Sequence, residues 1–301
     1  MIVRPRANLR DIMFAARGSI FFHVVWRVLL VTALSCGTVY WTRFHKDPLS
    51  ELGAAPFTFI GVSISIFMSF RNSTCYERWW EGRRLWGQLI ISARSLARET
   101  VLLRDDPVRA RILRGVCGFT YALAARLRGL DEAEAAAPWL EPQSELLVNQ
   151  PNITNAILAK IGEEISVLAE QGRISDWRYT VLEARLAELS GVQAGCERIK
   201  NTPLPYAYTL LIHRTNYLFC FLLPFGLSQQ LGWATPLRVS VVSYAFFGLD
   251  ALGDELEDPF GHDENDLPLS AMARTVERDQ LAALGVKTLP PPLAPVDYVL
   301  E

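Results

Sequence analysis

The sequence lacks the features that mark most soluble classes of protein. Its 30 Lys and Arg residues stand against 32 Asp and Glu, a formal net charge of -2, so no basic excess is available to neutralise nucleic-acid phosphates. Hydrophobic residues make up 50% of the chain, which excludes intrinsic disorder. No phosphate-binding loop, dinucleotide fingerprint or nucleophile elbow occurs. We therefore expect a folded protein with no nucleic-acid partner.

Cysteine and strand patterns are also scarce. The five cysteines include no Cys-x-x-Cys pair and show no spacing typical of a zinc site or a disulfide framework. No alternation of apolar and polar residues is long enough to predict a strand. The expected fold is therefore all-α. Unpaired cysteines fit a protein that lies in a reducing compartment or in a membrane.

Apolar residues are present in four long blocks. Residues 215–237 and 53–70 contain no charge, and 18–42 is interrupted by only one His and one Arg. A block of 18 residues, such as 53–70, makes about 27 Å of helix, close to the thickness of a bilayer core. A weaker block covers 239–249. Core helices of soluble proteins seldom reach such uncharged lengths, so we expect four transmembrane helices.

Arginines flank these blocks on one side. The first 17 positions hold four arginines against one acid, and four more arginines lie within residues 71–84. The first connection between blocks is balanced in charge, and the turn at 229–235 has no charge. The positive-inside rule therefore predicts a multi-pass protein of the inner (plasma) membrane with both termini in the cytoplasm.

The same blocks define four regions. Residues 1–70 hold the N-terminal segment and transmembrane helices 1 and 2, and 71–205 form a cytosolic helical region. Residues 206–252 hold transmembrane helices 3 and 4, and 253–301 form a cytosolic acidic loop and tail.

Helical periodicity runs through most of the cytosolic region. The second membrane helix is expected to continue past residue 71 as one long rod, because the following segment contains no proline. Further helices are expected at 108–129, 154–171 and 174–190, the last with Ser175 or Asp176 as its N-cap. Residues 131–151 are rich in proline and acid and predict a loop.

The second apolar block carries a regular row of bulky side chains. Val62, Ile66 and Phe70 recur at i, i+4 and i+8, which places them on one helix face. If several copies surrounded an axis, they would stack as rings, and a narrow apolar ring resists wetting by ions. The spacing alone favours a lipid-facing or helix-packing stripe over such rings.

Eight carboxylates fall within residues 250–266, which contain no Lys or Arg. Asp263, Glu264 and Asp266 form a tight group that can bind a divalent cation such as Ca²⁺, or the carboxylates can pair with arginines. Aspartates spaced four apart also leave open a membrane enzyme that holds a divalent metal.

Two further features interrupt the apolar pattern. Arg27, His213 and Arg214 either snorkel to the membrane surface or mark an ion pathway. Pro203 and Pro205 flank Leu204 and exclude a regular helix there. This segment is either an ordinary entry loop or a loop that projects Leu204 towards an axis.

Three motif clusters together resemble the bestrophin family, and in particular its bacterial branch. They are Arg78-Trp79-Trp80, Pro203-Leu204-Pro205, and Glu257-Asp258-Pro259-Phe260-Gly261 followed by Asn265-Asp266-Leu267-Pro268-Leu269. The resemblance covers about residues 1–275. The Arg-Phe-Pro triplet of animal members is absent.

This resemblance implies a homopentamer with one central pore. Val62, Ile66 and Phe70 would form its hydrophobic neck, and Leu204, supported by Pro203 and Pro205, would form a cytosolic aperture. Animal members gate with a Ca²⁺ clasp built partly from the acidic cluster, which has fewer acids here, so no cofactor is required.

The sequence thus predicts an all-α integral membrane protein that acts as an ion channel rather than an enzyme. Its expected partners are copies of itself, membrane lipid and the permeating ions. The family favours small anions such as chloride, as do the arginine-rich cytosolic helices. The acidic cluster favours a monovalent-cation channel of the same architecture, so the sign of the ion stays open. A secondary transporter would show paired repeats, and none is seen.

Overall fold

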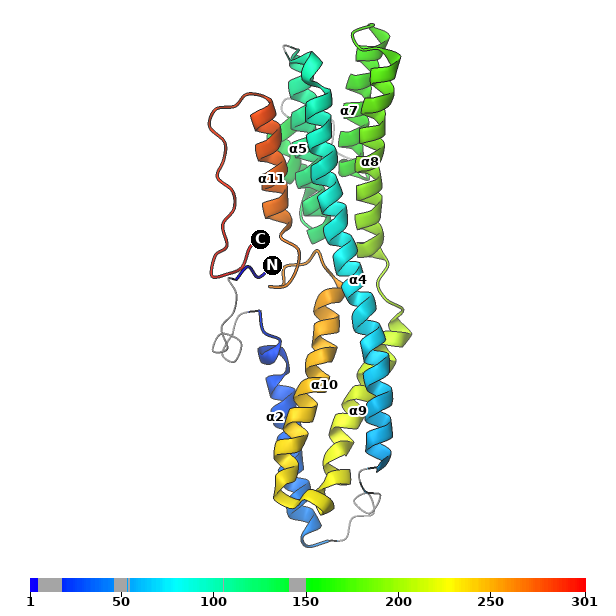
Figure 1. Ribbon diagram of the computed structural model, residues 1–301, viewed down its shortest axis with the longest axis vertical. Coiled ribbons are helices and arrows are strands. Elements are labelled where there is room, and N and C mark those ends of the chain that lie inside the picture. The colour runs from blue at the N-terminus through cyan, green and yellow to red at the C-terminus, as the bar shows by residue number, and fades with distance from the viewer. Residues whose placement is uncertain (5–17, 46–52, 54, 105, 141–149) are drawn as a thin grey trace. The chain divides into compact units, whose positions relative to one another are not determined.

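The computed structural model describes residues 1–301 except 5–17, 46–52, 54, 105 and 141–149. The described chain is helical, and its only extended pairing consists of isolated bridges among Ile2, Val296 and Val299 (Figure 1). The all-α prediction is therefore confirmed. Most of the N-terminal arginines and of the first connection, on which the predicted orientation partly depends, lie outside the described residues.

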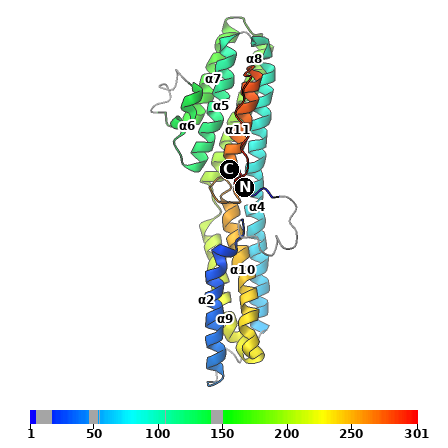
Figure 2. The same cartoon turned by 90° about the vertical axis from the view of Figure 1, so that its left-hand side faces the viewer.

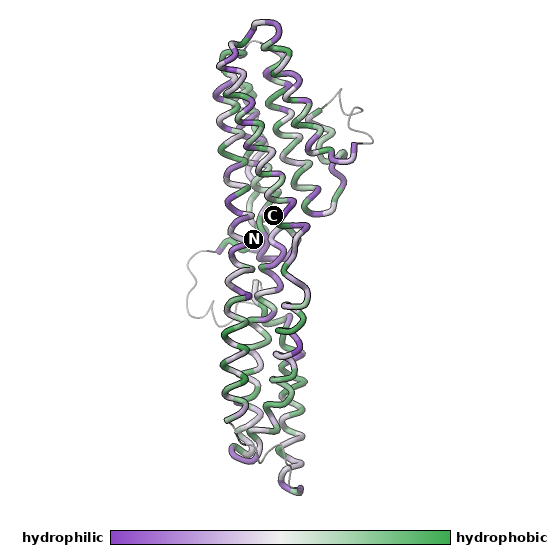
Figure 3. The backbone as a smooth tube through the Cα atoms, turned by 90° about the vertical axis from the view of Figure 1, so that its right-hand side faces the viewer, coloured by the Kyte–Doolittle hydropathy of each residue, from purple (hydrophilic) through white to green (hydrophobic). Residues whose placement is uncertain are grey.

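The chain forms two compact units. We call one the apolar unit, which comprises Pro5–Trp79 and Pro203–Asp258, and the other the polar unit, which comprises Met1–Arg4, Trp80–Thr202 and Pro259–Glu301. Hydrophobic residues predominate along the helices of the first, whereas those of the second mix both kinds of residue (Figure 3).

Four helices build the described part of the apolar unit. They are α2 (Phe21–Thr42), the first part of α4 (Ala55–Glu99), α9 (Tyr206–Leu231) and α10 (Thr235–Glu257), with the short 3-10 helix η3 (Gly232–Ala234) between the last two. Helices α2, α9 and α10 pack against one another, and buried side chains of α4 join the same core. Two described stretches are long and apolar enough to cross a membrane, Phe21–Thr42 and Tyr206–Glu257.

Large apolar side chains also cover the outside of this unit. Leu29 of α2, Leu218 of α9 and Leu237 of α10 are 63%, 59% and 71% exposed. A water-soluble protein seldom presents so much apolar surface, so lipid or further protein must cover these helices.

The polar unit is a helical bundle built around α5 (Pro107–Arg128). Helix α5 contacts α6 (Glu132–Leu140), α7 (Ile153–Glu170), α8 (Asp176–Asn201) and α11 (Leu269–Ala283), as Figures 1 and 2 show. The second part of α4, followed by the 3-10 helix η1 (Val101–Leu103), completes the unit.

Local sequence signals explain where these helices begin and end. The Asp106 side chain accepts a hydrogen bond from the Val108 amide, and Pro107 occupies the first turn of α5. Gly129, at φ 69°, ends the helix in the left-handed conformation that glycine adopts without strain. Ser175, one of the two candidates for the N-cap, caps α8, and α4 continues without a break from Ala55 to Glu99, as predicted.

Three helices differ from the prediction, two by their presence and one by where it ends. The proline- and acid-rich stretch expected as a loop contains α6, because Asp131 accepts hydrogen bonds from the Ala133 and Glu134 amides and several alanines follow. Helix α8 continues to Asn201 rather than ending near residue 190. Helix α11 lies in the segment expected to be a tail, where its buried face includes Met272.

A buried polar contact fastens α11 to α5. The Tyr121 hydroxyl donates to Glu277 Oε2 at 2.5 Å, and Arg274 Nε lies 2.8 Å from the same oxygen. Burial, together with the bond to Glu277, raises the pKa of Tyr121 to about 12, so the hydroxyl stays a donor at physiological pH. The contact therefore fixes α11 in the bundle rather than leaving it as a free tail.

Candidate functional site

The row of Val62, Ile66 and Phe70 lies on the outside of α4. These side chains are 56%, 51% and 63% exposed. The opposite side of the helix is buried by Ile64 and Met68, which are 7% and 1% exposed. Successive residues are 100° apart around a helix, so the row faces directly away from the buried stripe. The row therefore does not pack within the chain.

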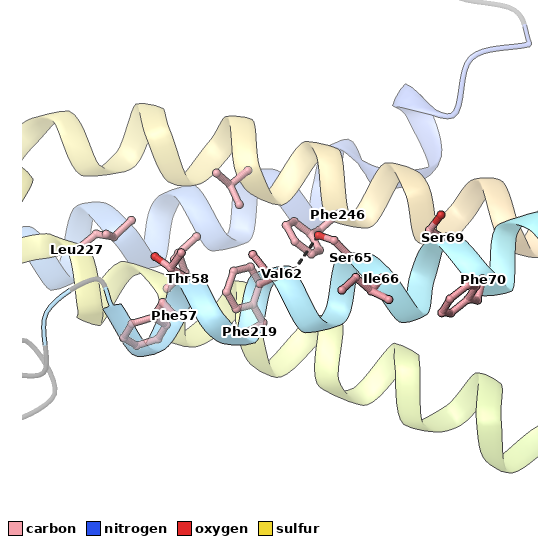
Figure 4. A pocket seen from close by; sticks show the side chains of 13 residues that line it. Phe57, Thr58, Val62, Ser65, Ile66, Ser69, Phe70, Phe219, Leu227 and Phe246 are labelled. Atoms are coloured by element: carbon pink, nitrogen blue, oxygen red, sulfur yellow. Dashed lines mark hydrogen bonds between the residues drawn. The ribbon is translucent and has the colours of Figure 1, made fainter.

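A shallow groove of about 640 Å³ runs along this side of α4. The row lies on α4 beside Thr58, Ser65 and Ser69, and Phe219 of α9 and Phe246 of α10 form further parts of the lining (Figure 4). The Ser65 hydroxyl donates to the Gly61 carbonyl at 2.8 Å, so this polar group is satisfied within its own helix. The groove is thus an apolar surface with small hydroxyl side chains among the bulky ones.

Leu204 lies in a short non-helical segment of the apolar unit. The helices on either side end at Asn201 and begin at Tyr206, which confirms that the two prolines interrupt the helix. The Leu204 amide donates to Glu257 Oε1 at 3.1 Å, and its side chain is partly exposed. The loop is therefore tied to the end of α10. Pro203 and Pro205 are exposed on either side of it.

A buried arginine joins α4 to α10. Arg71 directly follows the exposed row and is 0% exposed. Its Nη1 lies 3.3 Å from Asp250 Oδ1, and its Nη2 lies 2.5 Å from Asp254 Oδ1 and 3.6 Å from Glu257 Oε2. Removing a guanidinium from water is costly unless carboxylates match its charge, and the spacing of α10 supplies them on one face.

His213 of α9 contacts the same carboxylates. Its Nδ1 lies 2.8 Å from Asp250 Oδ2 and its Nε2 lies 3.4 Å from Asp254 Oδ1. His213 is therefore part of a charged network inside the apolar unit and not a side chain that snorkels to the surface. Arg27, by contrast, lies against the aromatic rings of Trp26 and Tyr217.

A glycine on α10 leaves room for two side chains of α4. A Cβ atom at Gly253 would lie 2.6 Å from Asn72 Oδ1 and 2.9 Å from Arg71 Nη1. Asn72 uses this proximity to donate to the Leu249 carbonyl at 2.9 Å. Gly253 thus provides the space in which the arginine reaches its partners.

Glu257 connects the Leu204 loop with the arginine. One of its oxygens accepts from the Leu204 amide while the other faces Arg71, and its backbone carbonyl accepts from Arg78 Nε at 3.2 Å. A single side chain therefore links the loop to the part of α4 that follows the exposed row.

The second half of the acidic run lies in the polar unit. The Asp263 amide donates to Asp266 Oδ2 at 2.8 Å, and Asp266 is buried while Asp263 and Glu264 are exposed. Within the described ranges, no three or more His, Cys, Asp or Glu side chains are grouped to hold a metal ion. The divalent cation at these three residues stays a prediction.

Sequence reasoning did not identify Arg71 as the partner of the acidic residues on α10. A charge within or beside an apolar segment implies an opposite charge nearby, and Arg71 was the arginine nearest to the second block. The pair is separated by 179 residues, so periodicity could not select it.

Together, the apolar helices and the charge pairs buried among them define a helical membrane protein. A family model described as bacterial and fungal bestrophin protein matches residues 1–282, and the chain belongs to the bestrophin family. This result confirms the resemblance seen in the motifs and indicates that the protein is not an enzyme.

Two relatives match almost from end to end. The chain is 40% identical over 298 residues to the voltage-dependent anion channel-forming protein mll4386 of Mesorhizobium japonicum, which covers 99% of this chain and 96% of the relative. It is 40% identical over 299 residues to the voltage-dependent anion channel-forming protein YneE of Escherichia coli strain K12, which covers 98% of each.

A solved structure has the same fold. The crystal structure of a bacterial bestrophin homologue from Klebsiella pneumoniae matches with a TM-score of 0.83 at 38% identity, covering 87% of this chain and 98% of that chain.

The buried charge network predicts a strong and non-additive effect on stability. Arg71→Met should lower the free energy of unfolding by about 3–5 kcal/mol, because it removes the guanidinium from the buried Asp250 carboxylate, which then keeps His213 as its described ion-pair partner. Arg71→Met combined with Asp250→Asn should cost less than the sum of the single changes. Unfolding of the detergent-solubilised protein, followed by circular dichroism, measures both.

The matched control is Arg214→Met, since Arg214 is exposed on α9. This change should shift stability by less than about 0.5 kcal/mol. Equal effects of Arg71→Met and Arg214→Met would contradict the network.

Proposed function

We propose that the chain is the subunit of a homopentameric ion channel of the plasma membrane that passes small monovalent anions such as chloride. Each subunit contributes four transmembrane helices, and the polar unit lies in the cytoplasm together with both termini. Val62, Ile66 and Phe70 of the five copies form an apolar neck around the axis, and Leu204 forms a second constriction.

The outward-facing row on α4 carries this proposal. Three bulky apolar side chains on one face of α4 are more than half exposed, and this face lies opposite the buried stripe of the helix. Copies of α4 around a symmetry axis would bring these rows together and make three stacked apolar rings. Such rings hinder the passage of hydrated ions until they widen or become wetted.

The length of the matches supports the same function. The relatives named as voltage-dependent anion channel-forming proteins match this chain over at least 96% of their own length. The similarity therefore extends over nearly the whole length of these relatives rather than over a fragment of them.

The charge pairing supports anions over cations. Asp250 and Asp254 face Arg71 and His213 rather than standing as free negative charges. Their field along a pore is therefore smaller than the number of carboxylates suggests. The neck itself is apolar, so it favours neither anions nor cations.

The reversal potential of the purified protein in a planar bilayer under a KCl gradient tests the proposal. We expect a reversal near the chloride equilibrium potential. A reversal near the potassium equilibrium potential would contradict anion selectivity, although the protein would still be a channel. Selectivity would then be assigned to the acidic residues.

The neck predicts a direct effect on conductance. Val62→Ala, Ile66→Ala and Phe70→Ala combined should raise the single-channel conductance at least about twofold, because smaller rings lower the barrier to wetting. Unchanged single-channel currents would count against the neck. Leu218→Ala, which shortens an exposed side chain of α9, is the matched control and should have no effect.

The aperture predicts an effect on selectivity. Leu204→Glu should lower the ratio of anion to cation permeability by about two- to tenfold, because it adds a negative ring to the axis. Leu204→Gln separates the effect of charge from the loss of apolar shape. If both variants keep the wild-type ratio, Leu204 is an ordinary loop residue.

A further inference from the structure

A second pocket of about 490 Å³ lies within the polar unit, far along the sequence from the row on α4. The end of α4, η1, the start of α5 and the end of α11 contribute to it. Among the described residues, its charged lining consists of four arginines and one acid, namely Arg94, Arg98, Arg104, Arg109 and Asp279. The lining therefore carries a strong positive excess.

Arg109 is the most unusual member of this lining. It is 5% exposed, and its two terminal nitrogens donate to backbone carbonyls, those of Ala283 at 2.9 Å and Ala97 at 3.2 Å. Its Nε has no hydrogen-bond partner among the described residues. Burial, together with the positive charge of Arg104, lowers the pKa of Arg109. A buried guanidinium without a carboxylate is costly, which favours a bound anion.

The other arginines leave charge available as well. Arg94 Nε pairs with Asp279 Oδ2 at 2.7 Å, so the one acid of the lining is already used. Among the residues that the structure describes, Arg98 donates only to the Ser95 hydroxyl, at 3.2 Å. Within the described part of the chain, Arg104 is exposed and has no ion pair. Three guanidinium groups thus line one pocket without a described carboxylate partner.

We propose that this pocket binds an anion that carries phosphate groups and at least two negative charges. Guanidinium groups match the oxygens of phosphate with paired hydrogen bonds, and several such groups around one cavity favour a multivalent ligand over chloride. The site is independent of the channel function, because it uses no residue of the neck or of the Leu204 loop.

Isothermal titration calorimetry of the full chain in detergent tests the site, with sodium pyrophosphate and with inositol trisphosphate as separate probes. Saturable binding of pyrophosphate supports the site with a free phosphate compound as its source. Saturable binding of inositol trisphosphate alone supports it with a lipid headgroup as its source. No saturable heat with either probe would overturn the proposal.

Variants locate the binding. Arg98→Gln and Arg104→Gln should each weaken the affinity about tenfold, since each removes a charged donor to phosphate. Both side chains are exposed, so the thermal unfolding midpoint should stay at the wild-type value. The matched control is Arg114→Gln, an exposed arginine of α5 outside the lining, which should leave the affinity unchanged. Equal affinity in all three variants would overturn the assignment to this pocket.

Discussion

The apolar unit depends on one buried arginine. Arg71 lies among hydrophobic helices with no exposure to solvent, and α10 meets its charge with carboxylates one helical turn apart. His213 binds the same carboxylates from α9, so charge joins three helices that the hydrophobic effect alone would leave free to slide. Gly253 leaves the space that this contact needs. The register of α4 against α10 follows from this network.

That register fixes which side of α4 is left open. The stripe that contains Ile64 and Met68 is used for packing, and Val62, Ile66 and Phe70 remain on the opposite side. Glu257 then ties the Leu204 loop to the same arginine. In the proposed channel, one network of contacts around Arg71 therefore positions both the neck and the aperture.

Much of this could be predicted from the sequence, because it depends on local or periodic signals. The continuous α4, the Ser175 cap and the break at the two prolines all follow from composition and spacing. The loop predicted where α6 lies was wrong, because its proline and acidic residues indicated a loop although its alanines favour a helix. Helix α11 was not predicted, because its segment was expected to be a tail. The partnership of Arg71 with α10 joins residues 179 positions apart, which no local pattern reports. The roles of the row and of Leu204 in a pore remain predictions, since they depend on further copies of the chain.

Access of water to the row on α4 tests the central claim most directly. Ile66→Cys should lose most of its current when a charged, membrane-impermeant thiol reagent is added to the bath, because the new thiol lines the conducting path. Leu29→Cys, equally apolar and 63% exposed on α2, should keep its current. The native cysteines are buried or half-buried, and the unsubstituted protein supplies the baseline. An Ile66→Cys channel that conducts normally after the reagent has labelled it, or block at Leu29→Cys instead, would contradict a pore along this face of α4.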